Sequence, residues 1–502
     1  MAGEIEKLKK VFKNGTEVEK RQICVFKKQA CLFFIECLVD SKVISSEVIK
    51  PLIAISEAEA PKDILNELLQ NVICFLGAKV VDFSKAQEDI LAGCTVLAID
   101  GVGYISLPAI GYEKRAIAEP PTSSVLKGPR EGFVEDVNVN VSMIRRRLKT
   151  NELRLKTLKI GRKSQTKVIL VYLNTIADKR VLKELICRLN AIDIDGIAAS
   201  YYIESLLRNN SSILFRQIGS TEKPDIAMAK ILEGRIVILV DGSPICLSVP
   251  YVFLEDFQNS DDYYMHPARA TFVRLIRLFG IIIGVLLPGF YVAMESYHYR
   301  VLPISLLINI LSSIENISFP PMVEILLALF LFEILNEASI RMPKYLGMAL
   351  SIVGALVLGD TAVQAGIITQ PSILVMAVSS ITIYILPDQA PTTSVLRLLF
   401  TLAGGFAGFF GIIVGLNLLT AMLCSTDNFG APLMAPFAPY IKMDQKDAII
   451  KSGVAQMITR PKSFNNKNRI RQTPRTHEQQ EAIIKEEPTL KPLLKKGKKN
   501  DK

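Results

Sequence analysis

The 502-residue sequence contains no tryptophan and only three histidines, which stand far apart at positions 266, 298 and 477. This spacing gives no support to a metal site built from clustered histidines. The eight cysteines form no Cys-x-x-Cys pair. Most lie inside apolar runs, a pattern typical of buried, reduced thiols in a cytoplasmic compartment. We therefore expect neither a metal nor a cofactor.

Charged residues are scarce in one long segment. Residues 279–440 contain only 12 acidic or basic side chains, whereas residues 1–278 contain 73. This contrast predicts a soluble domain followed by a membrane domain. The charged start of the chain, residues 1–20, has no apolar stretch of the signal-peptide kind, so we expect the soluble domain to stay in the cytoplasm.

The formal net charge of +10 is also uneven, because residues 441–502 alone contribute +9. Since the excess lies in one tail and no basic face is evident, we expect no nucleic acid as a partner. The tail is predicted to be disordered, cytoplasmic and attracted to acidic membrane lipids.

Six apolar runs divide the predicted membrane domain. They cover residues 278–294, 301–314, 322–335, 345–359, 373–386 and 398–424. Several are shorter than the roughly 20 residues that cross a hydrocarbon core, so we predict four to six membrane helices. An even number of crossings is expected, because the soluble domain and the basic tail should lie on the same side.

The soluble region contains an internal duplication. Residues 90–101 match residues 231–242 with six of twelve positions identical, and a weaker match relates residues 32–44 to residues 170–182. Each copy predicts a strand, an amphipathic helix and then two strands joined by an Asp-Gly turn. A Gly-rich phosphate loop at residues 101–103 is disfavoured, because the third glycine is missing.

These patterns predict an α/β cytoplasmic domain made of two related subdomains, an α-helical polytopic membrane domain and a basic disordered tail. The predicted boundaries are a charged N-terminal extension (1–21), subdomain 1 (22–125), a linker (126–149), subdomain 2 (150–266), the membrane domain (267–440) and the tail (441–502). Within the linker, Gly128, Pro129, Arg130 and Glu131 form a candidate interdomain loop. The arginines at 145–147 are expected at the solvated start of a helix or at the membrane surface. Binding of lipid head groups or of an acidic partner is the alternative.

Proline and glutamate interrupt the apolar runs. Pro320 and Pro321 cannot donate helical hydrogen bonds and are predicted to break the chain there. Glu324 and Glu333 follow in the next run, where a carboxylate needs protein or water around it. We consider both as candidates for facing a neighbouring subunit or an aqueous path. Glu337 is expected to pair with the arginine four residues later.

Small residues fill the segment 347–359, in which Val353 and Val357 share a helical face with Asp360 one turn on. A hydrophobic constriction with a polar mouth would gate a pore by dewetting. Close helix packing is the alternative interpretation. The glycine-rich stretch 403–411 is predicted to be a packing seam.

Several segments together resemble the GerA family, the A subunits of spore germinant receptors. They are 127–133 (KGPREGF), 151–154 (NELR), 239–244 (LVDGSP), 287–293 (LPGFYVA), 332–338 (FEILNEA), 341–343 (RMP) and 363–366 (VQAG). The resemblance covers roughly residues 22–442. It implies a protein of the spore inner membrane that works with a transporter-like B subunit and a lipoprotein C subunit. It also implies a homo-oligomeric ring, expected to be a pentamer, that forms a nutrient-gated ion channel.

Three other functions stay open. A related accessory, channel-like paralogue is associated with dipicolinate release, a transporter would place its site at broken helices, and a scaffold would not conduct ions. An enzyme is not expected, because the soluble region offers no nucleophile, base and orienting group at a recognisable spacing.

Overall fold

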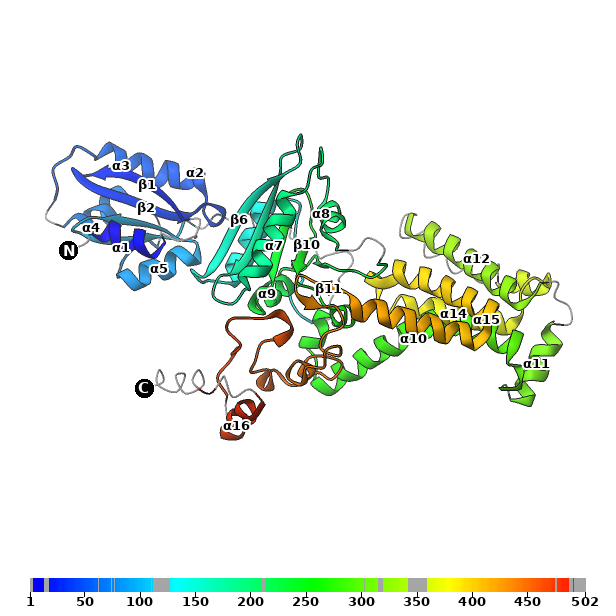
Figure 1. Ribbon diagram of the computed structural model, residues 1–502. Coiled ribbons are helices and arrows are strands. Elements are labelled where there is room, and N and C mark those ends of the chain that lie inside the picture. Colours follow the sequence, from blue (N-terminus) through cyan, green and yellow to red (C-terminus); the bar gives the residue numbers. More distant parts are fainter. Residues whose placement is uncertain are drawn as a thin grey trace.

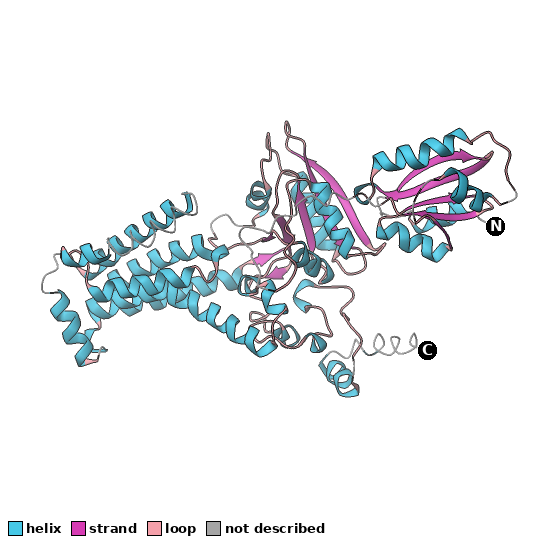
Figure 2. Ribbon diagram, turned by 180° about the vertical axis from the view of Figure 1, so that it is seen from behind, coloured by secondary structure: helices cyan, strands magenta, loops and turns pink. Residues whose placement is uncertain are grey.

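The computed structural model contains two sheet subdomains followed by a long helical region, which succeed one another along the molecule (Figure 1). Seen from behind, the large sheets are confined to the two subdomains (Figure 2). The structure describes residues 3–12, 18–61, 63–73, 75, 77–109, 111, 127–209, 213–301, 303–314, 319–341, 359–474, 476–486 and 491.

The first subdomain is built on a five-stranded antiparallel sheet with strand order β1-β2-β4-β5-β3. Its elements are α1 (Glu4–Val11), β1 (Val18–Val25), β2 (Lys28–Ile35), α2 (Ser41–Val43), α3 (Lys50–Ala54), α4 (Ile64–Glu67), β3 (Lys79–Val81), α5 (Phe83–Ala92), β4 (Thr95–Ile99) and β5 (Gly103–Leu107). Apolar clusters cover both faces of this sheet, so β4 is buried along its whole length. This burial explains why β4 has a continuous apolar sequence instead of an alternating one.

The second subdomain repeats the same order, as β6-β7-β9-β10-β8. It contains α6 (Val137–Arg147), β6 (Leu153–Ile160), β7 (Thr166–Leu173), α7 (Lys179–Asn190), α8 (Ser200–Leu207), β8 (Gly219–Thr221), α9 (Pro224–Leu232), β9 (Ile236–Val240) and β10 (Cys246–Val249). The predicted Asp-Gly turns connect β4 to β5 and β9 to β10. Gly101 and Gly242 have φ values of 73° and 81° there, which favour glycine. The predicted duplication is confirmed.

A helix precedes the sheet in each copy and is held by the aspartate of the hairpin turn. Asp100 accepts a hydrogen bond from the backbone of Ile5 at 3.0 Å, and Asp241 accepts one from Val137 at 3.3 Å. Both helices contribute to the core of the sheet that follows them. The stretches that we predicted as an N-terminal extension and a linker therefore contain the first helix of each subdomain.

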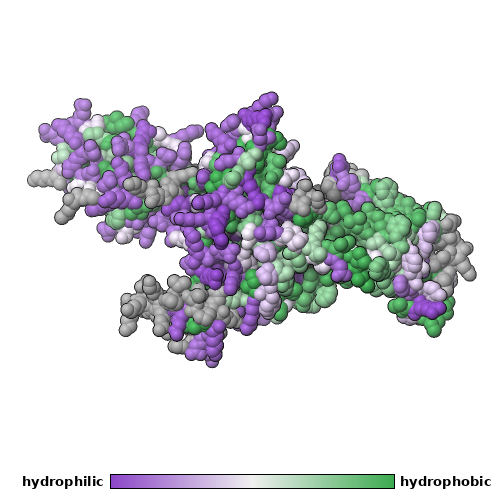
Figure 3. All heavy atoms as spheres, in the orientation of Figure 1, coloured by the Kyte–Doolittle hydropathy of each residue, from purple (hydrophilic) through white to green (hydrophobic). Residues whose placement is uncertain are grey.

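The helical region contains α10 (Pro267–Tyr297), α11 (Ile304–Ile314), α12 (Pro321–Arg341), α14 (Gln370–Ile383) and α15 (Ala390–Ser425). Among the described residues, α10 and the segment Pro387–Ser425 are long and apolar enough to cross a membrane. Hydrophobic side chains dominate the visible face of this region, and hydrophilic ones that of the subdomains (Figure 3). The predicted run 345–359 lies almost wholly outside the described residues, and the number of crossings stays a prediction.

Helices α10 and α15 pack closely through glycine. A Cβ placed on Gly404 would lie 2.3 Å from the carbonyl oxygen of Gly289, and one on Gly289 would lie 2.4 Å from that of Phe400. Small residues permit this backbone approach, so the predicted packing seam is confirmed. Gly408 interrupts the helical geometry of α15 with a φ of 59°.

The prediction of a disordered tail is wrong for residues 441–474. This part forms short 3₁₀ helices, among them Lys442–Lys446 and Lys462–Phe464, and packs against the second subdomain and the start of α10. Phe464 lies under the Arg235 guanidinium at 4.0 Å, and the Arg460 Nε donates to the backbone of Leu232 at 2.7 Å. Composition concealed these contacts, because Lys451 and Arg460 bind backbone carbonyl groups within the chain. Helix α16 (His477–Glu486) follows.

Candidate functional site at the junction of the sheet and helical regions

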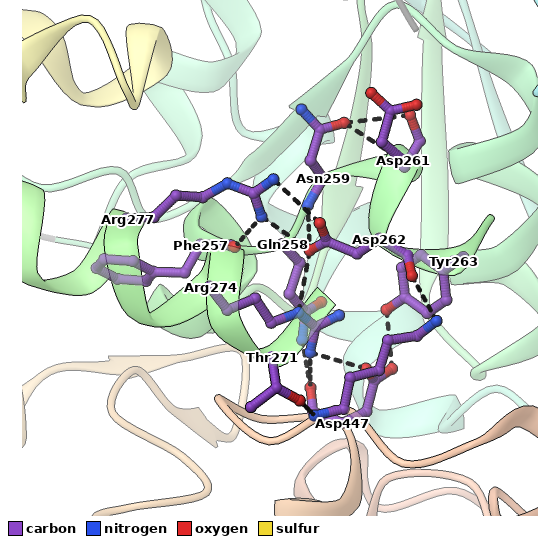
Figure 4. A network of polar contacts seen from close by, with 12 residues as sticks. Phe257, Gln258, Asn259, Asp261, Asp262, Tyr263, Thr271, Arg274, Arg277 and Asp447 are labelled. Atoms are coloured by element: carbon purple, nitrogen blue, oxygen red, sulfur yellow. Dashed lines mark hydrogen bonds and ion pairs between the residues drawn. The ribbon is translucent and has the colours of Figure 1, made fainter. Parts of the chain in front are cut away.

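A buried aspartate joins the second subdomain to α10. Asp262 is fully inaccessible and lies in the 3₁₀ helix Ser260–Tyr263, a few residues before α10 begins. Its carboxylate accepts hydrogen bonds from the Nε of Arg274 at 3.0 Å and from two nitrogens of Arg277 at 2.8 and 3.0 Å. Figure 4 shows both guanidinium groups turned toward this carboxylate. The two arginines are one helical turn apart, so they can share one partner.

The C-terminal tail completes this network. The Nη1 of Arg274 donates to the side chain and backbone of Asp447 at 3.0 and 3.1 Å and to the carbonyl of Ala448 at 2.6 Å. Lys451 reaches the backbone carbonyl of Asp262 at 2.5 Å, and the hydroxyl of Tyr263 donates to Asp447 at 2.8 Å. The 3₁₀ helix Ser260–Tyr263, the start of α10 and the sequence-distant tail therefore meet at one point.

Burial makes these charges mutually dependent. Arg274 is 1% exposed and Lys451 is 3% exposed, so each needs its acidic or carbonyl partner to offset the loss of water. Burial raises the pKa of the Asp447 carboxyl above its usual range, although Arg274 and the Tyr263 hydroxyl favour its ionised form. Arg274 and Arg277 directly precede the apolar run that begins at residue 278. The structure pairs both inside the chain.

A second buried aspartate, Asp256, connects the same segment to the start of α15. It lies in the 3₁₀ helix Phe253–Phe257 and accepts hydrogen bonds from the Tyr251 hydroxyl and the Gln389 amide. Arg216 lies 3.8 Å from its carboxylate and 3.5 Å from that of Asp388. Burial raises the pKa of Asp256 to about 6, against the opposing effect of Arg216.

These two aspartates define what the arrangement can do. Asp262 holds α10 and Asp256 holds the entry to α15, and both belong to the single segment 253–263. These are also the helices that pack most closely on each other and carry the two apolar spans. A movement of the second subdomain would therefore be transmitted to both helices through this one segment. The arrangement can couple the subdomain mechanically to α10 and α15. Within the described ranges, no group of three or more His, Cys, Asp or Glu could hold a metal ion.

The candidate interdomain loop lies beside the same junction. Gly128 has a φ of 131°, and a Cβ on it would lie 2.7 Å from the ring of Tyr264, the residue that follows the 3₁₀ helix of Asp262. Glu131 forms an ion pair with Arg147 at the end of α6. Pro129 is half-buried and Arg130 is exposed. The loop therefore contacts the segment that enters α10.

The other predicted polar residues lie in the helical region. Pro321 begins α12, and Pro320 precedes it. Glu324 is 1% exposed and accepts hydrogen bonds from the backbone and hydroxyl of Thr369 at 2.5 and 2.8 Å, so it faces α14 of the same chain.

Glu333 is half-exposed and lies 3.4 Å from Arg397. The predicted pair of Glu337 with Arg341 is confirmed. Of the predicted gate, Val353 and Val357 lie outside the described residues, and Asp360 is exposed and accepts a hydrogen bond from Gln364 at 2.9 Å.

Sequence reasoning missed Asp256, Asp262 and Asp447. One signal was available for Asp262, because it lies 12 and 15 residues before two arginines that open an apolar run. For Asp447 the composition of the tail hid the signal, because an excess of basic residues led to the prediction of disorder.

Residues 6–463 match the family described as "Bacillus/Clostridium GerA spore germination protein". The chain belongs to the GerA family. The match extends beyond the 22–442 of the sequence resemblance and includes Asp447 and Lys451, so this part of the tail lies within the GerA family region.

Individual GerA relatives cover most of the chain. "Spore germination protein KA" of Bacillus subtilis (strain 168) is 34% identical over 94% of this chain and 88% of its own length. "Spore germination protein GerLA" of Bacillus cereus is 35% identical over 82% and 84%. The crystal structure of the N-terminal domain of the A subunit of the Bacillus megaterium spore germinant receptor GerK3 is 26% identical and covers 50% of this chain and 94% of that chain, with a TM-score of 0.39.

Proposed function

We propose that this chain is the A subunit of a spore germinant receptor in the spore inner membrane. In this proposal an oligomeric ring of chains, expected to be a pentamer, forms an ion channel that opens in response to nutrients and triggers germination. The observation that carries the proposal is the near full-length match to spore germination proteins. Two apolar helices that are both attached to the segment 253–263, one by ion pairs and one by a hydrogen bond, support it.

The junction suggests how such a channel is controlled. The chain would work with a transporter-like B subunit and a lipoprotein C subunit. The B subunit would deliver the difference in ligand-binding free energy between the closed and open rings. The segment 253–263 would transmit a shift of the sheet subdomains to α10 and α15, because its two aspartates hold both helices. The candidate loop at Gly128 to Glu131, which contacts Tyr264, would add a second connection to the same segment.

Deletion of the gene in the spore-forming bacterium that encodes this chain tests the role. Mutant spores should fail to respond to at least one nutrient mixture, and the full-length gene should restore the response. Spores that sense nutrients normally but release dipicolinate slowly would indicate the accessory paralogue instead. Conductance of the purified chain in liposomes separates a channel from a scaffold, since only a channel dissipates an imposed ion gradient.

The gate is tested by Val357→Ala. Shortening a side chain that lines a hydrophobic constriction widens it and eases wetting, so spores with this variant should begin to germinate without nutrient. Val414→Ala on α15 is the matched control, because Val414 is 40% exposed on a helix that carries no predicted gate residue. Normal dormancy of Val357→Ala spores that contain normal amounts of the protein would refute the gate assignment.

A further inference from the structure

The helical region contains a buried cluster of oxygen atoms outside the junction. Tyr291 and Glu295 lie one turn apart on α10, Glu324 lies in the first turn of α12, and Thr369 and Ser372 lie at the start of α14. An apolar core surrounds the cluster and includes Val292, Ile325, Ala328, Ile368 and Met376. Three helices therefore bring two carboxylates and three hydroxyls together in a place that water does not reach.

Part of this cluster is already satisfied. Glu324 accepts hydrogen bonds from the backbone and hydroxyl of Thr369, and the Thr369 hydroxyl also bonds to Ser372 at 2.8 Å. Thr369 is the N-cap of α14, whose helix dipole favours a negative charge at this end. The charge of Glu324 is thus offset within the chain.

The rest of the cluster is not satisfied. Both carboxylate oxygens of Glu295 are inaccessible to solvent and make no hydrogen bond. The same is true of the hydroxyl of Tyr291, a residue that is only 6% exposed. The Tyr291 hydroxyl faces the Glu295 carboxylate as well as Thr369 and Ser372, and the Glu295 and Glu324 carboxylates are close enough to repel each other. Among the described residues, no basic side chain forms an ion pair with Glu295.

A buried carboxylate without a partner is costly, and more so in a region suited to lipid. The N-terminus of α14 already offsets the charge of Glu324. One positive charge would therefore be enough to balance the remaining charge of Glu295. Carboxylate and hydroxyl oxygens are ligands that hard cations accept. We propose that Glu295, Glu324, Tyr291, Thr369 and Ser372 form a binding site for one alkali metal ion, Na⁺ or K⁺. The site would connect α10, α12 and α14. The proposal goes beyond the germinant-receptor role, because it is argued only from the positions of these oxygen atoms.

Purified full-length protein in lipid nanodiscs is the material for the test. Thermal unfolding is followed by circular dichroism at equal ionic strength in NaCl, KCl and choline chloride, since the chain has no tryptophan for fluorescence. A ligand that binds only the folded state raises the midpoint with its concentration. We expect this rise in Na⁺ or K⁺ and none in choline, together with retention of about one radioactive ²²Na⁺ or ⁸⁶Rb⁺ per chain.

Variants locate the site. Glu295→Gln should weaken ion binding by about tenfold or more and remove the salt-specific rise in the midpoint. Tyr291→Phe, which removes one hydroxyl, should weaken binding less. Glu337→Gln is the matched control, because Glu337 lies on α12 in an exposed ion pair with Arg341 and should leave binding unchanged.

Two results would overturn the proposal. Equal midpoints in all three salts, with no retained ²²Na⁺ or ⁸⁶Rb⁺, would show that the cluster does not bind an alkali metal ion. A rise produced only by Mg²⁺ or Ca²⁺ would exclude the monovalent class. Neither result depends on germination, so failure of the ion site and failure of the receptor role can be told apart.

Discussion

At the scale of single residues, the junction depends on carboxylates that are buried away from solvent. Asp256 and Asp262 are separated by six positions but differ in their partners. Asp262 faces two arginines, whereas Asp256 accepts two neutral hydrogen bonds and has one arginine at 3.8 Å. The pKa of Asp256 is therefore raised to about 6, because a single distant cation offsets burial only in part.

This raised pKa predicts a pH-dependent stability. The folded state binds the Asp256 proton more tightly than the unfolded state does. The stabilisation that this proton gives the folded state is therefore present at low pH and is lost as the pH rises through about 6. When the pH is lowered from 7.5 to 5, the group should add on the order of 1 kcal/mol to the free energy of unfolding. Denaturant titrations at both pH values measure it.

Asp256→Asn should remove that increment, whereas Asp388→Asn, which alters the exposed partner of Arg216, should retain it. An unchanged pH dependence in Asp256→Asn would show that another group is responsible.

At the scale of elements, α10 is attached to the soluble region by more than its chain connection. Its first turns carry Arg274 and Arg277, whose shared partner Asp262 precedes the helix. A membrane helix fixed in this way cannot rotate about its axis without separating an ion pair that is out of water. The angle at which α10 leaves the subdomain is therefore set by side chains, not by the backbone alone.

Asp262→Ala tests this attachment. Removing one partner from a buried ion pair costs about 3–5 kcal/mol, because the other charge stays buried. We expect a loss of that size in the free energy of unfolding, measured by chemical denaturation in detergent. Asp261→Ala is the control, since among the described residues the Oδ1 of this neighbouring carboxylate has no hydrogen-bond partner. Equal losses in the two variants would argue against the network.

At the scale of the whole molecule, the tail is part of the folded unit. It passes beside the second subdomain and the start of α10 (Figure 1). Through Asp447, Ala448 and Lys451 it supplies acceptors to Arg274 and a donor to the Asp262 backbone. The family match also reaches residue 463.

Truncation after Tyr440 should therefore destabilise the protein. Arg274 would lose three acceptors at once, at a cost of about 3 kcal/mol or more. The expected result is a lower unfolding midpoint and less protein in the membrane fraction. Truncation after Pro474 keeps every junction contact and should behave like the full chain. If both truncated proteins were equally stable, the tail would not be a structural part of the junction.

The sequence by itself determined the features that depend on local pattern. The duplication, the Asp-Gly hairpins and the separation of soluble from apolar regions follow from periodicity, turn chemistry and composition. The glycine seam of α10 and α15 was visible for the same reason, since Gly404 lies in a run of small residues.

Only the tertiary structure decided which charges meet. Arg274 pairs with Asp262 at a distance of 12 residues and with Asp447 at 173 residues, and Glu295 approaches Glu324 from another helix. No local period encodes such contacts, because they arise where separate elements pack. A count of charges treats each as solvated, whereas burial removes the water and makes every charge depend on the partner that the fold supplies.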